Sequence, residues 1–215
     1  MPLLKGPLSD QCKNSILPCI YNMCRINRRR QDLAASLGIV PALKKVVLEK
    51  SPMKEFALPI LLDFAHTSNA TRKELWKNDG VTFFVDLLEG HSQYWQAIAV
   101  NSIAVWLTND TENVVQVLIQ PSCIGKLIRM YFVFAILLLI YCYFLIPCIL
   151  GFFRDSSTTM LQNLHKPLLD MISKSSELSA ALSSSSLYVT SLLKKLTSTK
   201  EAIVIRSLLR ILQLL

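Results

Sequence analysis

Apolar residues recur along the chain in short blocks with helical spacing, and polar, turn-forming stretches separate the blocks. The clearest block runs from Tyr94 to Leu107, where the apolar residues at 95, 98, 99, 103 and 106 follow an i, i+3, i+4 pattern. Strand-like alternation is rare, and the sequence has only six glycines. This pattern predicts an all-α fold.

The predicted helices repeat at nearly constant intervals. "GIVPALKKVV" from Gly38 and "GVTFFVDLLE" from Gly80 are 42 residues apart, as are "KEFALPILLDFA" from Lys54 and "QAIAVNSIAVWL" from Gln96. The shorter polar helices "TRKELWKN" and "TENVVQVLIQ" are 40 residues apart. Two short helices and a longer third one therefore form a unit of about 42 residues, which is typical of armadillo or HEAT repeats. One triplet cannot bury its apolar face alone, so we expect neighbouring triplets to stack as a helical solenoid.

An uncharged run from Tyr131 to Phe153 breaks this register. "TSTKEAIVIRSLLRI" from Thr197 aligns with "SPMKEFALPILLDF" from Ser51 at an offset of 146 residues, which is no multiple of 42. Without the 23 uncharged residues the offset is 123, or three repeats of 41. The predicted organisation is an N-terminal tail (1–13), armadillo-like repeats (14–130), an apolar insertion (131–153) and C-terminal armadillo-like repeats (154–215).

Three interpretations of residues 131–153 stay open. As a transmembrane helix the run would reach roughly 35 Å and span a hydrocarbon core of about 30 Å, but it would separate repeats that must stack. As one long apolar helix that interrupts the solenoid, it would need apolar cover on every side. As a translated, unspliced T-rich intron, it would explain the lost register, because Phe, Leu, Ile and Val codons share a central T. Sequencing cDNA across codons 125–158 tests the intron interpretation.

Composition and charge limit the kinds of functional site that the sequence suggests. The net charge of +8 and the pI near 9.3 suit an anionic partner or surface and say nothing about the fold. The six cysteines form no C-x-x-C pair, so we expect reduced, buried thiols. The three histidines have no partner at metal-ligand spacing, and surface or loop positions are expected for them. No metal or cofactor is predicted.

Motifs for phosphoryl transfer are missing from the sequence. A phosphate-binding loop needs closely spaced glycines, and the six glycines here never fall within one loop-sized window. The patterns G-x-G-x-x-G, G-x-x-x-x-G-K-[ST], H-R-D and D-F-G do not occur. We therefore expect a non-catalytic chain.

The candidate partner-binding residues are four arginines, one asparagine and one tryptophan: Arg25, Arg28, Arg29, Arg30, Asn101 and Trp95. The arginines form the dense basic cluster "CRINRRR", which is interpretable as a nuclear signal, a nucleic-acid contact, a dock for an acidic partner or a solvated helix face. Asn101 lies on the third helix of its repeat. Such helices line the concave groove of a solenoid, where an Asn amide can clamp a peptide backbone. Trp95 is expected to pack in the core, with a ligand-binding shelf as the alternative.

Several long strings resemble a known family. "NMCRINRRRQDLAASLGIVPALKKVV", "TRKELWKNDGVTFFVDLLE" and "YWQAIAVNSIAVWL" resemble the armadillo-like C-terminal region of fungal septation-initiation-network Ser/Thr protein kinases. The plant MAP kinase kinase kinase epsilon group is similar. The resemblance covers roughly Asn14–Arg129 and Ser156–Leu215. The kinase domain that precedes this region in the family has no counterpart here, so no catalytic residue is carried over.

The resemblance implies a role in cytoplasmic signalling that couples mitotic exit to septum formation. It also implies an association with the spindle pole or cytoskeleton, and protein partners that include a small GTPase or a spindle-pole scaffold. The armadillo-like region would be the docking surface, and no nucleic acid is expected as a partner. The alternative from another class is a single-pass membrane protein with a small helical cytosolic region, in which 131–153 is the span.

Overall fold

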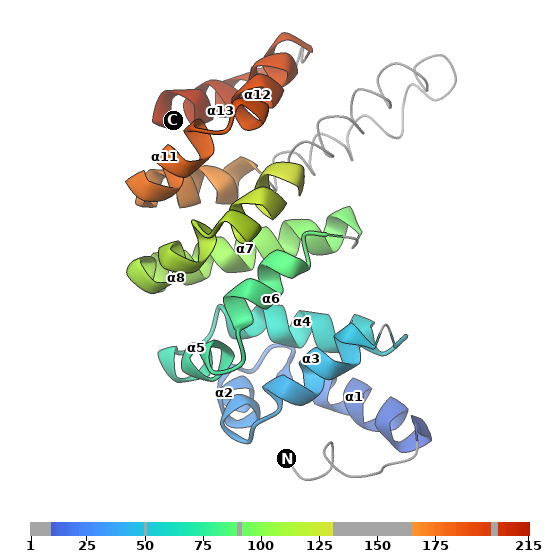
Figure 1. Ribbon diagram of the computed structural model, residues 1–215. Helices are drawn as coiled ribbons and strands as arrows, with labels where there is room; N and C mark the ends of the chain where they lie inside the picture. Colours follow the sequence, from blue (N-terminus) through green and yellow to red (C-terminus); the bar gives the residue numbers. More distant parts are fainter. Residues whose placement is uncertain (1–9, 50, 90–91, 131–164, 199–201) are drawn as a thin grey trace, which may run out of the picture. The chain divides into compact units, whose positions relative to one another are not determined.

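The computed structural model describes residues 10–49, 51–89, 92–130, 165–198 and 202–215, and every regular element in these ranges is a helix (Figure 1). The predicted all-α class is confirmed. The helices are α1 (Asp10–Cys24), α2 (Arg28–Ser36), α3 (Val40–Leu48), α4 (Lys54–Phe64), α5 (Asn69–Trp76), α6 (Gly80–Asp86), α7 (Gln93–Asn109), α8 (Thr111–Leu118), α11 (Ser176–Ser183), α12 (Ser186–Ser198) and α13 (Ala202–Leu214). Residues 121–130 and 165–174 are helical as well.

In chain order these helices follow the predicted sets of three. The sets are α2–α3–α4, then α5–α6–α7, then α8 with 121–130 and 165–174, and finally α11–α12–α13. The long apolar helix predicted for 131–153 lies outside the described residues. Within the described ranges, no helix combines the length and apolar character needed to cross a membrane.

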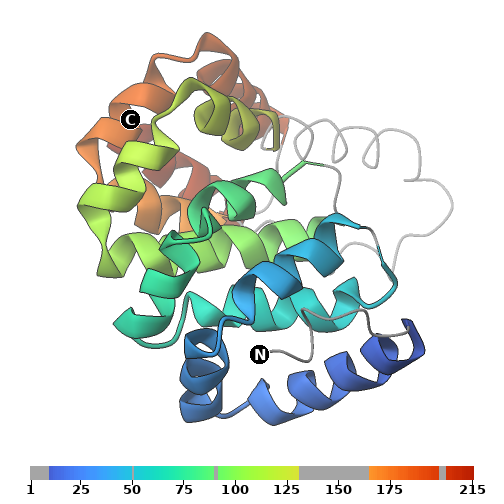
Figure 2. The ribbon, with the colours of Figure 1, turned by 60° about the horizontal axis from the view of Figure 1, so that its bottom comes forward.

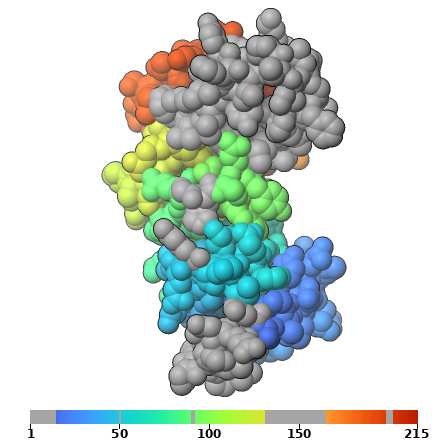
Figure 3. Space-filling view, turned by 90° about the vertical axis from the view of Figure 1, so that its right-hand side faces the viewer, coloured from blue at the N-terminus to red at the C-terminus, as the bar shows by residue number. Residues whose placement is uncertain are grey.

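The chain divides into two compact units, Met1–Val81 (unit 1) and Thr82–Leu215 (unit 2), and each is described by itself. In unit 1, α4 packs against both α1 and α3, and α2 packs against α5. Figures 2 and 3 show α1, in blue, beside the cyan α3–α4 segment. The rings of Tyr21 and Phe56 meet edge to face at 5.7 Å and join α1 to α4. Leu43, Leu61 and Phe64 are fully buried, so α4 forms the centre of this unit.

In unit 2, α7 packs against α8, and α12 packs against α11 and α13. Trp106 of α7 is fully buried and meets Phe84 of α6 edge to face, with ring centroids 5.9 Å apart. Exposed ion pairs join α6 and its following turn to residues 121–130. Lys126 Nζ lies 2.5 Å from Asp86 Oδ1, and Arg129 Nη2 lies 2.6 Å from Glu89 Oε1. The two residues of each pair are 40 positions apart, which is one repeat.

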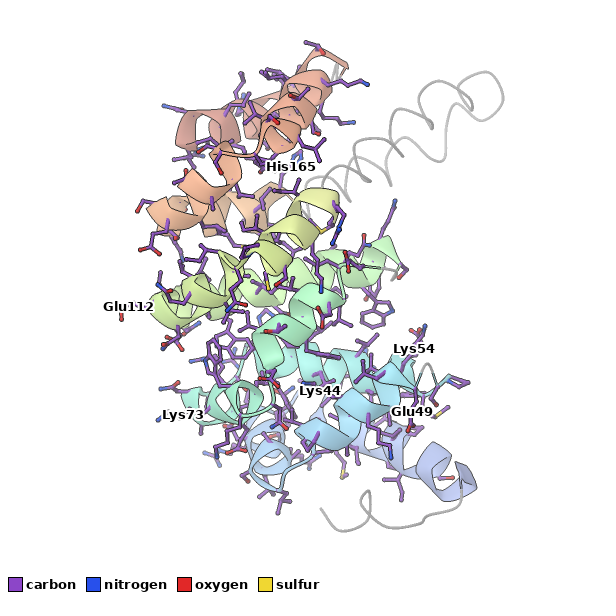
Figure 4. All side chains as sticks on the ribbon, viewed as in Figure 1. Lys44, Glu49, Lys54, Lys73, Glu112 and His165 are labelled. Carbon is purple, nitrogen blue, oxygen red and sulfur yellow. The ribbon has the colours of Figure 1, made fainter. Side chains whose placement is uncertain are left out.

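The surface or loop position expected for the histidines is wrong for His165, which is only 2% exposed (Figure 4). Burial, together with the positive charge of Lys195, lowers the pKa of His165 to about 4. The imidazole is therefore neutral at physiological pH and packs as part of the core of unit 2. The thiols of Cys24 and Cys123 are buried and reduced, as expected, while that of Cys19 is reduced but exposed.

Two equivalent turns between the first and second helices of a set use different residues in the left-handed conformation. Gly38 has φ +77° after α2, and Asp79 has φ +52° after α5. The sequence alignment pairs Gly38 with Gly80, but Gly80 is the first residue of α6. A side chain in this conformation crowds the following carbonyl, so Asp79 carries a conformational penalty that Gly38 avoids.

Asp79→Gly should therefore raise the free energy of unfolding by about 0.5–1 kcal/mol, because glycine adopts φ +52° without that penalty. Equilibrium urea denaturation followed by circular dichroism measures the change. Asp79→Ala is the matched control, since it removes the carboxylate but keeps Cβ. Equal stabilisation by glycine and alanine would show that the charge of Asp79, rather than its backbone, is the source of the effect.

Candidate functional site

The four candidate arginines lie where α1 ends and α2 begins, with Arg25 in the connecting turn and the other three at the start of α2. Arg25, Arg28, Arg29 and Arg30 are all exposed, and these four neighbouring residues are here called the arginine cluster. The Asn27 side chain caps α2 by accepting a hydrogen bond from the Arg30 N–H at 3.1 Å. Arg28 to Arg30 consequently occupy the first turn of that helix.

Two contacts fix the shape of this turn. The buried Gln31 Nε2 donates to the Cys24 carbonyl at 2.8 Å, which satisfies the C-terminal end of α1. The Arg25 guanidinium lies 5.9 Å from the centroid of the Tyr21 ring, a cation–π contact. The turn is therefore held by groups other than the guanidinium groups of Arg28 to Arg30.

The nearest carboxylate to the arginine cluster in sequence is directed elsewhere. Asp32 accepts hydrogen bonds from Ser68 Oγ at 2.6 Å and Thr71 Oγ1 at 2.5 Å. Burial alone would raise the pKa of Asp32, but the hydroxyl donors outweigh it and hold the pKa below its usual value. Because Ser68 also caps α5, this carboxylate joins α2 to the start of α5.

The positive field of the arginine cluster reaches the C-terminal end of α4. His66 follows that helix, and its pKa is lowered by burial and by the charge of Arg28. The buried Arg72 donates to the Thr67 carbonyl at 2.8 Å and to the Ala65 carbonyl at 3.4 Å. Arg72 therefore satisfies the end of α4, whereas the four arginines of the cluster make no ion pair within the described residues.

Asn101 and Trp95 both lie on α7, in unit 2, and they face different surroundings. Asn101 is exposed, whereas Trp95 is only 9% exposed and meets the exposed Tyr94 ring edge to face at 5.0 Å. The core position expected for Trp95 agrees with this burial, and the neighbouring aromatic surface belongs to Tyr94. Tyr94 has no feature in the sequence that separates it from the buried aromatic residues.

The exposed side of α7 forms a continuous strip. At helical spacing it contains the exposed Tyr94, Asn101 and Thr108, with the half-buried Ile98 and Val105 between them. Apolar side chains that alternate with hydrogen-bonding groups can accommodate an extended peptide, with the Asn101 amide available to its backbone. At the far end Lys174 Nζ donates to Thr108 Oγ1 at 2.6 Å, so helical residues 165–174 border the strip.

Groups suited to metal or small-molecule chemistry do not assemble in the described part of the chain. No three His, Cys, Asp or Glu side chains there could hold a metal ion together. An open surface depression of about 460 Å³ lies in unit 1 between α3 and the turn after α5. Lys44 Nζ donates to the Asn78 carbonyl across this depression, and charged, mostly exposed side chains surround it (Figure 4). Its shape is that of a groove between packed helices.

Comparison with known proteins shows that the chain is similar to short segments of much longer proteins. No family model matches it. It is 44% identical over 131 residues to the cytokinesis protein sepH of Emericella nidulans, a match that covers 59% of this chain and 10% of sepH. It is 33% identical over 183 residues to MAP3K epsilon protein kinase 2 of Arabidopsis thaliana, covering 85% of this chain and 12% of that kinase. The chain thus spans about a tenth of the length of these relatives.

Among solved structures, the chain resembles a computationally designed armadillo repeat protein for modular peptide recognition. The TM-score is 0.70 at 18% identity, over 99% of this chain and 79% of the designed one. This likeness confirms the predicted armadillo-type fold.

Proposed function

We propose that this chain, which is homologous to a segment of sepH and of the plant MAP3K epsilon kinases, is the non-catalytic protein-interaction region of a Ser/Thr protein kinase acting in septation and cytokinesis. It docks partner proteins in the cytoplasm through the surface of its helical repeats. A small GTPase and a spindle-pole scaffold are the proposed partners. The observation that carries this proposal is that the homologous segment is an all-helical, armadillo-like region rather than a nucleotide-binding fold.

The exposed strip of α7 supports a docking role. Extended concave surfaces are the usual binding faces of helical-repeat proteins, and the designed armadillo protein was made for peptide recognition. By analogy with that fold, Asn101 pairs with the backbone of a bound peptide, while Ile98 and Val105 contact its side chains. We assign the arginine cluster to a second contact on the partner.

Residues 131–153 are proposed to be an insertion into the third set of helices. The second and third helices are joined by residues 49–53 in the first set and 87–92 in the second, whereas 131–164 separate the described helices of the third. The extra length at this one connection supports an interruption of an otherwise regular repeat.

The proposal predicts that this chain can replace its counterpart in sepH. Emericella nidulans sepH that lacks the matched segment should fail to form septa, and the same protein carrying this chain in that place should restore them. A chimera without residues 131–153 should restore septation at least as well, because the insertion is not part of the docking surface. Septa per hyphal length, counted after cell-wall staining, give the readout.

Two variants of the chimera identify the docking surface. Asn101→Ala should reduce both the number of septa and the amount of the proposed GTPase or scaffold partner that co-purifies with the chimera. Asn109→Ala is the matched control on the same helix, because its amide is satisfied by the Val105 carbonyl at 2.7 Å. Immunoblotting establishes equal expression. Normal septation by sepH without the segment would contradict the proposal.

A further inference from the structure

The arginine cluster is a concentrated positive charge without internal compensation. Its four guanidinium groups are exposed, and within the described ranges none of them forms an ion pair with a carboxylate. The nearby Asp32 is held by Ser68 and Thr71 instead. Two other exposed cations of unit 1 are balanced differently, since Lys45 pairs with Glu49 and Lys77 pairs with Glu74.

The position of three of these arginines opposes the stability of their own helix. Arg28, Arg29 and Arg30 fill the first turn of α2, and that turn contains no acidic residue. The backbone dipole of a helix disfavours positive charge at this end, by a few tenths of a kcal/mol or more for each exposed residue. Side chains that weaken the local fold without compensation are typical of binding surfaces.

We propose that the arginine cluster docks a phosphorylated, acidic segment of a partner protein. This inference rests on the proposed function and specifies the chemical nature of the partner segment that binds. A guanidinium group presents parallel N–H donors that match two phosphate oxygens, and several arginines on one turn can bind a single phosphate or two neighbouring ones. Phosphopeptide-binding domains use arginine clusters in this way. The four charges of the cluster are fewer than the roughly six to ten phosphate contacts that give a nucleic-acid complex its steep salt dependence.

His66 provides an internal reporter for an anion at this site. Arg28 contributes to its lowered pKa, so the imidazole senses the charge of the cluster. A phosphate bound to Arg28 would offset that charge, and the pKa of His66 would rise. Burial, the larger cause of the lowered pKa, would be unchanged by ligand binding.

The direct test uses a fluorescein-labelled synthetic peptide with two phosphoserines between aspartates, and measures its binding to the full chain by fluorescence anisotropy at physiological salt. Arg28→Gln/Arg29→Gln/Arg30→Gln should weaken binding by about tenfold or more, since each lost guanidinium removes charge-assisted hydrogen bonds. The melting temperature of this variant should stay unchanged or rise, because the helix loses unfavourable charges. Lysine at the same three positions should restore only part of the affinity, because its ammonium group lacks the fork.

The matched control is Lys45→Gln/Lys73→Gln/Lys77→Gln, which removes three exposed positive charges from the same unit and should change affinity less than about twofold. Equal losses in the two triple variants would overturn the proposal in favour of net charge. Equal affinity for the unphosphorylated peptide would overturn it as well. Tighter, arginine-dependent binding to phosphatidylserine vesicles or to a single-stranded DNA oligonucleotide would assign the cluster to a membrane or a nucleic acid.

Nuclear magnetic resonance titration of His66 adds a second readout. The phosphopeptide should raise the pKa of His66 in the native chain and leave it unchanged in the triple arginine variant. In the sepH chimera, the triple arginine variant should reduce septation. Full septation by that variant would overturn the role of the cluster while leaving the proposed function intact, whereas failure of the unmodified chimera would count against the proposed function itself.

Discussion

Replacing Trp106 with alanine should lower the free energy of unfolding by about 4 kcal/mol, the largest effect expected of a single substitution in the core. The indole is fully buried in unit 2 and meets Phe84 edge to face. Alanine would remove its contacts on α6 and leave a cavity that the surrounding helices fill only in part. Urea denaturation followed by far-ultraviolet circular dichroism measures the loss.

Trp76→Ala is the comparison for that experiment. Trp76 ends α5 and is half-buried, so its removal should cost about half as much or less. Trp106→Phe should cost less than Trp106→Ala, because phenylalanine fills most of the site and keeps an aromatic contact with Phe84. Equal losses for Trp106→Ala and Trp76→Ala would contradict the assignment of Trp106 to the centre of the core.

Acidification should destabilise the protein through His165 by about 3 kcal/mol between pH 6.5 and pH 4. The pKa of His165 in the folded chain is about 4, below the value of 6.5 for an exposed histidine. Over this range the unfolded chain binds a proton that the folded chain does not bind, so unfolding is favoured as the pH falls. The contribution to stability is fully present above pH 6.5 and is lost as the pH falls toward 4.

His165→Gln isolates this effect, because glutamine keeps a polar side chain of similar size but does not titrate in the range. As the pH falls from 6.5 toward 4, the free energy of unfolding of the native chain should decrease relative to that of the variant. Asp32 and Asp63, whose pKa values are lowered and raised, are present in both proteins and therefore cancel. A difference that does not change with pH would contradict the buried, neutral state of His165.

The sequence predicts the helices of this protein because their apolar residues recur at helical spacing. The same reasoning predicts the burial of Trp106, which lies on the apolar side of α7. The repeat could be recognised because each helix set needs the same buried positions at the same interval. The periodicity of apolar residues reflects the average burial of a helix face, so it can predict helices, their repeat and the residues buried on that face.

Features that depend on one contact or one dihedral angle could not be predicted from the sequence. The sequence around His165 gives no sign of its burial, which depends on residues distant along the chain; Lys195, for example, acts on its pKa. The Asp32 carboxylate accepts a hydrogen bond from Thr71, 39 positions away, and no pattern near either residue predicts that bond. The left-handed residue of the second turn is Asp79 rather than the aligned Gly80, and the sequence does not indicate this because an aspartate can also adopt that conformation.

The sequence makes exposure the ordinary expectation for the arginine cluster and Asn101, since four nearby charges and an amide on a helix are rarely buried, and all five residues are exposed. It could not reveal that Asp32 turns away from the arginines, or that Arg28 influences His66. These relations come from the packing of α2 against α5 and from the place of His66 after α4. Together with the four nearby arginines of the sequence, these relations define a surface for which we expect a phosphorylated, acidic ligand.

The ion pairs between α6 and residues 121–130 also bear on how a repeat protein avoids misfolding. Lys44 of α3 stands 42 positions before Asp86 of α6, the offset between these two second helices, so α3 has a cation where α6 has the anion that pairs with Lys126. If residues 121–130 docked one repeat too early during folding, Lys126 would meet Lys44 and lose its partner. Each exposed pair adds little to native stability, yet the opposite charges of Lys44 and Asp86 favour the correct order of repeats over a skipped one.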